Sequence, residues 1–245
     1  MNLPQFKAIP DCTKCELHTE AINPGVPTIH YKESAFPSPE TPYMIVVGMN
    51  PGLNEDKKNE PFVGPTGQML KNIYLSSLDI LKTHTVYFTN AARCCTPGDT
   101  QLRNSHIKSC WPYTEEDLET ITDFHTGQGS ILCLGSHALN AVSKWVLPTK
   151  SLTLREGIEK QGMAFTYNNK ELFFFCTYHP AGVMRSPNLK YAVSEHLELI
   201  GQQLHGHVPS PSLPDIQPPR SPRKEKSNDG NEQGSDSSQS GCLFR

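Results

Sequence analysis

The chain has 245 residues, of which 36% are hydrophobic and 19% charged, and its net charge is −3. This size fits one globular domain with some unstructured sequence, and the near-neutral charge argues against recognition of nucleic acid by a globally basic surface. No stretch approaches the roughly 18 apolar residues of a membrane helix, and the first residues lack the apolar core of a secretory signal. We therefore expect a soluble intracellular protein without a membrane partner, and such a compartment disfavours a disulfide framework for the 8 cysteines.

Short runs of β-branched and aromatic residues alternate along the chain with segments of helical character. In chain order, the expected strands span 43–48, 85–90, 131–135 and 172–180, and the expected helices span 66–78, 113–125, 136–146 and 188–204. The segment 163–175 reads as a hairpin that turns at Asn168 and Asn169. Apolar strands that alternate with helices are typical of a parallel sheet covered on both faces. The sequence therefore predicts an α/β domain.

The last part of the chain, 206–245, differs from the rest in composition. It is rich in proline, serine and charge and nearly free of aromatic residues. Such a segment cannot bury enough apolar surface to offset the entropy lost on ordering. We expect a disordered C-terminal tail, which is a candidate binding segment for an unidentified protein partner.

Polar side chains gather where the four predicted strands end. Asn50 follows the first strand in GMNPG, Asn90 ends the second, GSH follows the third, and His179 follows the fourth in YHPAG. Each residue alone has an ordinary explanation as a helix cap or a satisfied core histidine. The carboxyl ends of parallel strands share one edge of the sheet, where ligands bind in open α/β folds. Together these residues predict a ligand site at that edge.

Three segments carry a specific resemblance. GMNPGLNEDKKNEPFVGPTGQML, YFTNAARC and TYHPAGVMRSP resemble three signature regions of the uracil-DNA glycosylase superfamily. The PFVGPTGQ extension and the cysteine pattern are similar to its family 4, the iron–sulfur uracil-DNA glycosylases. The resemblance covers about residues 10–204 and implies a three-layer α/β/α sandwich around a short, mainly four-stranded parallel sheet, formed by residues 1–205. It also implies a monomeric, monofunctional repair enzyme whose partner is uracil-containing DNA, single-stranded or mismatched.

One departure concerns the first motif. Family 4 members usually have Glu-Ala where this chain has Met49 and Asn50, whereas GMNPG is similar to the single-strand-selective and mismatch-specific branches. The active site is therefore expected to be a hybrid, and the substrate range stays open. A glycosylase for hypoxanthine or xanthine, and a binding module without turnover, are the alternatives.

The resemblance implies a role for each motif residue. Asn50 would hold the attacking water with help from Glu55, and His179 would donate a hydrogen bond to the departing uracil anion. Gly48, Met49, Phe62 and Asn90 would form the uracil site; of these, Phe62 stacks on the base, and Asn90 reads its edge through one amide donor and one acceptor.

DNA contact is expected in the segment after the histidine motif. Arg185 would contact phosphate or the groove, and Val183 and Met184 would wedge into the base stack.

Four cysteines match the ligand positions of family 4. Cys12 and Cys15 form a C-x-x-C pair, and Cys94 and Cys110 lie near the second motif. The resemblance implies that they bind one 4Fe–4S cluster and pin the N-terminal arm to the domain. From spacing alone, a structural zinc site is equally reasonable.

Overall fold

The structure is a computed structural model that describes residues 3–96, 98, 101–149 and 151–205. Within these residues the strands form one sheet in the order β1-β3-β2-β4-β6-β5. Their bounds are β1 Ile29–His30, β2 Tyr43–Gly48, β3 Thr85–Asn90, β4 Gly129–Leu134, β5 Met163–Tyr167 and β6 Lys170–Thr177. The four central strands are parallel, and the two edge strands pair antiparallel. The predicted α/β class is confirmed, and the four predicted strands are the four central ones.

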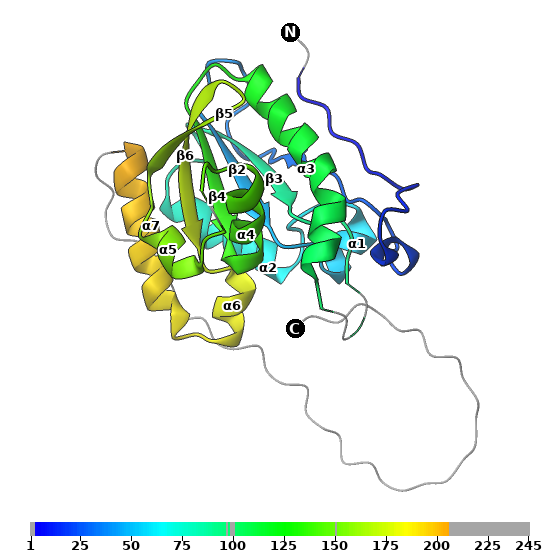
Figure 1. The fold of residues 1–245 in the computed structure, drawn as a ribbon. Coiled ribbons are helices and arrows are strands. Elements are labelled where there is room, and N and C mark those ends of the chain that lie inside the picture. The colour runs from blue at the N-terminus through cyan, green and yellow to red at the C-terminus, as the bar shows by residue number, and fades with distance from the viewer. Residues whose placement is uncertain (1–2, 97, 99–100, 150, 206–245) are drawn as a thin grey trace, which may run out of the picture.

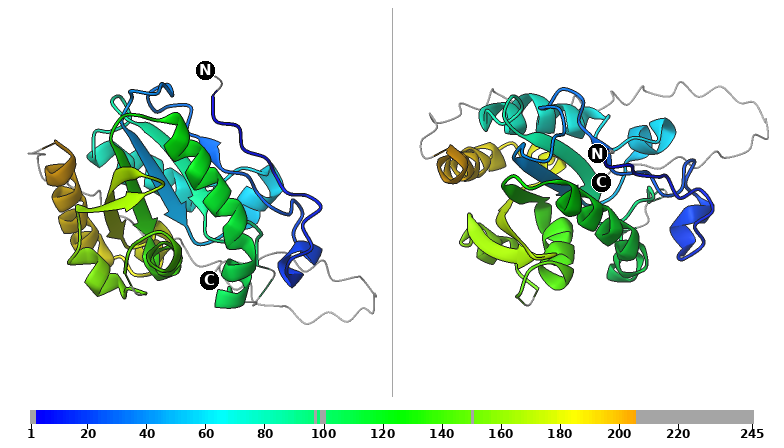
Figure 2. Two further views of the ribbon diagram at one scale, coloured as in Figure 1. Left: turned by 45° about the horizontal axis from the view of Figure 1, so that its top comes forward. Right: turned by 90° about the horizontal axis from the view of Figure 1, so that it is seen from above.

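Helices cover both faces of the sheet (Figures 1 and 2). One face carries α3 (Asn104–Phe124), α4 (Gly135–Trp145) and α5 (Leu154–Ile158). The other carries α2 (Pro65–Met69), the π-helical turn η2 (Leu70–Leu75), α6 (Pro180–Arg185) and α7 (Leu189–His205). The 3₁₀ turn η1 (Glu16–Thr19) lies in the N-terminal arm, and α1 (Leu53–Lys58) follows β2.

The strands read as continuous apolar runs because both of their faces are buried. In β2, Tyr43, Ile45 and Val47 pack with the core under α3 and α4. Met44 and Val46 pack with the core under η2 and α7. The two cores, one on each side of the sheet, hold the strand ends and their polar loops in fixed positions.

Several local predictions differ from the structure. The helix predicted at 113–125 begins nine residues earlier, at Asn104, and continues through Pro112, so Cys110 lies inside α3 rather than in a loop. The helix predicted at 66–78 contains the π-helical turn η2. The hairpin is confirmed, and both turn residues, Asn168 and Asn169, have positive φ.

The predicted tail, 206–245, lies outside the described residues. Among the residues that are described, no helix is long and apolar enough to cross a membrane.

Candidate active site

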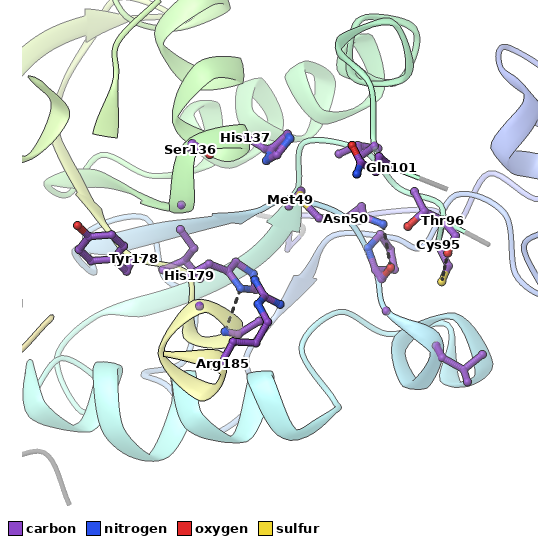
Figure 3. A pocket seen from close by; sticks show the side chains of 18 of the residues that line it. Met49, Asn50, Cys95, Thr96, Gln101, Ser136, His137, Tyr178, His179 and Arg185 are labelled. Atoms are coloured by element: carbon purple, nitrogen blue, oxygen red, sulfur yellow. Dashed lines mark hydrogen bonds between the residues drawn. The ribbon is translucent and has the colours of Figure 1, made fainter. Parts of the chain in front are cut away.

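A cavity of about 550 Å³ opens at the carboxyl ends of the parallel strands. The turn after β2, the loop after β3, the start of α4 and the start of α6 surround it (Figure 3). Of the predicted site residues, Met49, Asn50, His179 and Arg185 line this cavity. The structure thus brings together, at the predicted edge of the sheet, side chains that are up to 136 residues apart in the chain.

Asn50 is held in one orientation by its own amide. Its Nδ2 donates hydrogen bonds to the carbonyl oxygens of Pro51, at 3.1 Å, and Cys94, at 3.3 Å. Because carbonyls accept and do not donate, these partners fix which end of the amide is nitrogen. Among the described residues nothing donates to Oδ1, so this oxygen remains an acceptor for a ligand or water in the cavity.

His179 caps helix α6 with its own ring. Its Nδ1 accepts a hydrogen bond from the backbone N–H of Ala181 at 3.2 Å. Burial first, and then the charge of Arg185, lower the pKa of His179 to about 4. The ring is therefore neutral near pH 7, and because Nδ1 accepts, the proton resides on Nε2. His179 is a neutral hydrogen-bond donor at the cavity.

Gly48, Phe62 and Asn90 meet at a second point of the same edge. Gly48 and Asn90 are cross-strand neighbours at the ends of β2 and β3. A Cβ on Gly48 would lie 2.4 Å from Asn90 Oδ1 and 2.7 Å from Phe62 Cζ, so the side chains of Asn90 and Phe62 fill the space above the glycine. Asn90 is 6% exposed, and in the described part of the chain its recorded hydrogen bond is that of its backbone carbonyl with Thr114 Oγ1. Its side-chain amide is not sealed in the core, so it can bond to a ligand at this edge.

The backbone at Phe62 is unusual. Its φ is 56°, a left-handed value that is uncommon for a non-glycine residue. A Cβ on Gly67 would lie 1.8 Å from the carbonyl oxygen of Phe62, so only glycine fits there. The ring packs on Phe88 at a centroid distance of 5.2 Å. Strained backbone of this kind is often found at functional sites.

Glu55 does not line the cavity. It is 6% exposed, and its two carboxylate oxygens accept backbone N–H bonds from Gly52 at 3.2 Å and from Gly64 at 2.7 Å. The side chain therefore ties the turn that carries Asn50 to the loop that carries Phe62. Its local role is to position these two segments.

The three residues predicted to touch DNA have different environments. Arg185 is exposed and lines the cavity, as Figure 3 shows. Met184 is partly buried against the core under α7. Val183 is 0% exposed in the same core, so its predicted insertion into a base stack is wrong. The helix α6 exposes Arg185 but points Val183 into the core, so of these residues Arg185 is the one that DNA can readily contact.

The cavity also holds side chains to which no role was assigned. Gln101, Ser136, His137 and Tyr178 line it (Figure 3). Burial lowers the pKa of His137, so a second neutral imidazole lies near His179. His137 could have been found from the sequence, because it belongs to the GSH segment that follows the third predicted strand. Gln101 carried no signal, because it lies in a loop without a motif.

The four candidate cysteine ligands lie in one region of the protein, where Cys94 interacts with Cys12 and Cys15, and Cys110 with Cys94 and Cys12. Cys94 Sγ accepts from the backbone N–H of Gly25 at 3.4 Å, and Cys110 Sγ accepts from that of Arg93 at 3.2 Å. Burial, with a smaller contribution from the nearby Cys15 and Cys12, raises the pKa of Cys94 to about 11. Burial likewise raises the pKa of Cys110 to about 12. In the described residues, no group of three or more His, Cys, Asp and Glu side chains is arranged to hold a metal ion.

Two buried charged residues attach the N-terminal arm. The carboxylate of Asp56 accepts the backbone N–H bonds of Ile22 and Asn23, both at 2.9 Å. The guanidinium of Arg93 donates to Thr28 at 3.2 Å and pairs with Asp117 at 2.5 Å. The arm that carries Cys12 and Cys15 is thereby fixed beside Cys94 and Cys110.

Comparison with known proteins agrees with this geometry. A family model described as the uracil DNA glycosylase superfamily matches residues 36–201. The type-4 uracil-DNA glycosylase of Sulfurisphaera tokodaii is 31% identical over 193 residues, which cover 77% of this chain and 78% of that protein. The type-4 enzyme of Archaeoglobus fulgidus is 29% identical over 203 residues, covering 80% and 89%. That of Saccharolobus solfataricus is 28% identical over 164 residues, covering 66% and 71%. The chain therefore belongs to the uracil DNA glycosylase superfamily.

Proposed function

We propose that this protein is a monofunctional DNA-repair glycosylase that hydrolyses the N-glycosidic bond of uracil in DNA. One observation carries the proposal. The acceptor oxygen of Asn50 and the neutral donor His179 line one cavity, at the sheet edge where the side-chain amide of Asn90 and the ring of Phe62 also lie. The names of the relatives, type-4 uracil-DNA glycosylase, support the same substrate.

The reaction calls for electrostatic stabilisation. As the C–N bond stretches, the sugar gains oxocarbenium character and the departing uracil gains negative charge, so groups placed where charge develops supply most of the catalysis. The base must first leave the stack, which costs a few kcal/mol and less for a mispaired base. A preformed cavity at the sheet edge suits an extruded nucleotide.

Recognition of the base would fall to Asn90 and Phe62. A carboxamide offers one donor and one acceptor, which complement the O4 and N3–H of uracil. Cytosine presents the reverse pattern, with a donor at its 4-amino group and an acceptor at N3, so an amide kept in the orientation that suits uracil would not pair with it. Phe62 would stack on the ring, and the absence of a side chain on Gly48 leaves room for both contacts.

Departure of the base and attack by water would fall to His179 and Asn50. The Nε2–H of His179 would bond to uracil O2 and stabilise the anion without transferring its proton. Oδ1 of Asn50 would hold the water that attacks the sugar. An amide is a weak base, but a strongly electrophilic sugar requires a positioned water more than an abstracted proton.

Glu55 and Arg185 would act around this centre. Because both oxygens of Glu55 are occupied by backbone amides, we assign it a positioning role rather than direct contact with the water. The exposed Arg185 would contact a phosphate of the bound strand. The roles of Met49 and Met184 stay predictions.

We further propose that Cys12, Cys15, Cys94 and Cys110 bind a 4Fe–4S cluster. The donor set fits in chemical kind, although the four thiols are not arranged as a closed metal site in the described residues. Cys94 lies near Cys12 and Cys15, Cys110 lies near Cys94 and Cys12, and the sulfurs of Cys94 and Cys110 accept backbone N–H bonds, which are known to tune such clusters. When bound, the cluster supplies a structural link between the N-terminal arm and the loop after β3. Purified protein should contain about four iron atoms per chain and absorb broadly near 400 nm. Stoichiometric zinc would support the alternative site.

The decisive experiment is an excision assay with uracil-containing oligonucleotides. Single-stranded and mismatched substrates, incubated without added metal or nucleotide, should break at the uracil position after alkali treatment. Intact strands that are nevertheless bound would favour a binding module. Cleavage only at hypoxanthine or xanthine would move the protein to another deaminated base.

A further inference from the structure

A second cavity, of about 390 Å³, lies between α3 and α4. The helices run side by side on one face of the sheet (Figures 1 and 2). The cavity falls within the size range of small-ligand sites in proteins. Its lining combines an aromatic ring, two carboxamides, two hydroxyls and a cation, from Trp145, Asn104, Asn140, Thr149, Ser151 and Lys144. The proposed glycosylase reaction uses none of them.

One wall of this cavity is a supported aromatic ring. Trp145 stacks on Trp111 with a centroid distance of 5.1 Å and an interplanar angle of 19°. Trp111 is only 2% exposed, so it fixes the plane of Trp145 from the core. The ammonium of the exposed Lys144 lies 4.7 Å from the centroid of the Trp145 ring. A cation–π contact at an exposed site is weak, so an incoming planar group can displace it.

The polar wall has unused hydrogen-bonding capacity. Asn140 Oδ1 accepts from Ser151 Oγ at 3.0 Å, which leaves the amide nitrogen of Asn140 free to donate. The hydroxyl oxygen of Thr149 is buried and has no partner in the described part of the chain. This hydroxyl lies beneath the cavity surface, so the contact open to a ligand is the amide nitrogen of Asn140. Every nucleobase carries acceptor atoms on its edge to which this nitrogen can donate.

The two cavities are neighbours. Leu102 lines the first and Asn104 the second, and two residues of chain span at most about 7 Å. On the other side, Leu154 lines the first cavity and Ser151 the second. The second cavity is therefore close enough for a nucleotide that flanks a target in the first cavity to reach it.

We propose that the second cavity binds an unpaired base of the same DNA strand, at a position flanking the target nucleotide. The base stacks on Trp145, the amide nitrogen of Asn140 donates to an acceptor atom of the kind that every base carries, and Lys144 moves from the ring to the adjacent phosphate. Stacking accepts any base, so the subsite adds affinity for single-stranded DNA without sequence preference. This inference rests on the proposed function, because it needs DNA as the substrate.

Intrinsic fluorescence offers a direct test. The chain contains 2 tryptophans, and both belong to this stack, so the emission reports on this site alone. Titration with a single-stranded uracil oligonucleotide extended on one side should change the emission. The same length with abasic positions in the flank should leave it unchanged, and extension on the opposite side identifies the direction of the strand. An equal change in emission with the base-containing flank and with the abasic flank would overturn the proposal.

Variants separate stacking from folding. Trp145→Ala should weaken binding of the extended strand by about fivefold to a hundredfold, and Trp145→Phe by less. Asn140→Asp keeps the acceptor for Ser151 but adds a negative charge, so it should also weaken binding of the extended strand. Gln202→Glu, an exposed amide-to-acid change on α7, is the matched control and should have no effect.

A minimal uracil oligonucleotide distinguishes the two proposals. If the subsite is real, Trp145→Ala and Asn140→Asp excise uracil from the minimal oligonucleotide at the wild-type rate. They lose only the tighter binding of the longer strand. If the wild type excises uracil equally well from short and long strands, the subsite is wrong while the glycosylase stands. If no substrate is cut or bound, the proposed function fails first.

Discussion

The two ends of the central sheet each hold a buried histidine, and the histidines differ in what surrounds them. At the amino end of β2, His125 stacks on Tyr43 at a centroid distance of 4.4 Å, and its Nε2 bonds to the hydroxyl of Tyr87 at 2.9 Å. At the carboxyl end, Nδ1 of His179 accepts the capping hydrogen bond of its own helix, α6, so its Nε2–H can donate to a ligand in the cavity that His179 lines. Burial lowers the pKa of both histidines to about 4.

The comparison shows that a displaced pKa does not by itself mark a functional site. His125 is fully buried, with Nε2 bonded to Tyr87 and Nδ1 without a side-chain or backbone partner in the described residues, and no ligand can reach it, so its low pKa is a consequence of packing. His179 has the same pKa but faces a space large enough for a nucleotide. The open donor, and not the protonation state, distinguishes the candidate active edge from the closed one.

Exchanging the two histidines for alanine should therefore have opposite effects. His179→Ala removes a donor to the developing anion and should lower uracil excision by about 10²–10³-fold with little change in stability. His125→Ala leaves Tyr87 without its partner and a gap beside Tyr43, and should cost about 3 kcal/mol of unfolding free energy while excision by the folded protein persists. Single-turnover rates and chemical denaturation measure both. Similar activity in the two variants would contradict the comparison.

Asn50→Ala tests the acceptor at the open edge. Loss of the oxygen that would hold the water should reduce excision by about 10²-fold without weakening DNA binding. Asn50→Asp is the paired variant, since it keeps an acceptor but sets a carboxylate against the carbonyls of Pro51 and Cys94. It should retain more activity than the alanine variant if the oxygen is what matters. Gel-based excision and fluorescence anisotropy separate the two readouts.

Gly48→Ala tests the uracil site. The added Cβ would overlap the tips of Asn90 and Phe62, which can move, so the protein should fold but with a displaced uracil site. We expect about a tenfold to a hundredfold loss of excision, and a thermal midpoint that changes by only a few degrees. Unchanged excision would mean that these three residues do not contact the base.

The fold was predictable because the central strands are buried on both faces. Each strand supplies alternate residues to two cores, so the runs at 43–48 and 85–90 are unbroken and easily recognised. The predicted helix begins only at Tyr113, because helical spacing of apolar residues is clear from Leu118 onward, whereas α3 begins at Asn104 and continues through Pro112. The two-residue strand β1 carries too few residues for a pattern.

The candidate site was predictable where a residue stands at a strand end. Asn50, Asn90 and His179 follow or end strands, so topology alone brings them to one edge. Glu55 could not be assigned in this way, because its partners are backbone amides of Gly52 and Gly64 that only the folded loops bring together. The stack of Trp111 on Trp145 joins two helices and leaves no local signal.

Acidification offers a test of both histidines at once. Their folded-state pKa, about 4, lies below the ordinary histidine value of 6.5, so between these pH values the unfolded chain binds protons that the folded protein does not. Stability should therefore fall as pH drops from 6.5 toward 4, by up to about 1.4 kcal/mol per pH unit for each such histidine. The excision rate of the folded protein should stay flat down to about pH 5, because His179 remains neutral. Thermal melts and single-turnover assays at matched pH measure the two curves, and an excision rate that falls near pH 6.5 would contradict the neutral donor.

Glu55 tests the comparison most directly. It lies at the same edge of the sheet as His179, but both of its carboxylate oxygens are bonded to backbone amides inside the protein. Glu55→Gln keeps one acceptor and loses the charge, so it should cost about 2 kcal/mol of stability and at most tenfold in excision. Asp56→Asn is the matched control, since the Asp56 carboxylate likewise accepts two backbone N–H bonds, but from Ile22 and Asn23 of the N-terminal arm. If Glu55 only positions the loops, the two variants should lose similar stability, and Glu55→Gln should raise KM more than it lowers kcat. A loss in kcat approaching that of Asn50→Ala would instead place the carboxylate at the attacking water.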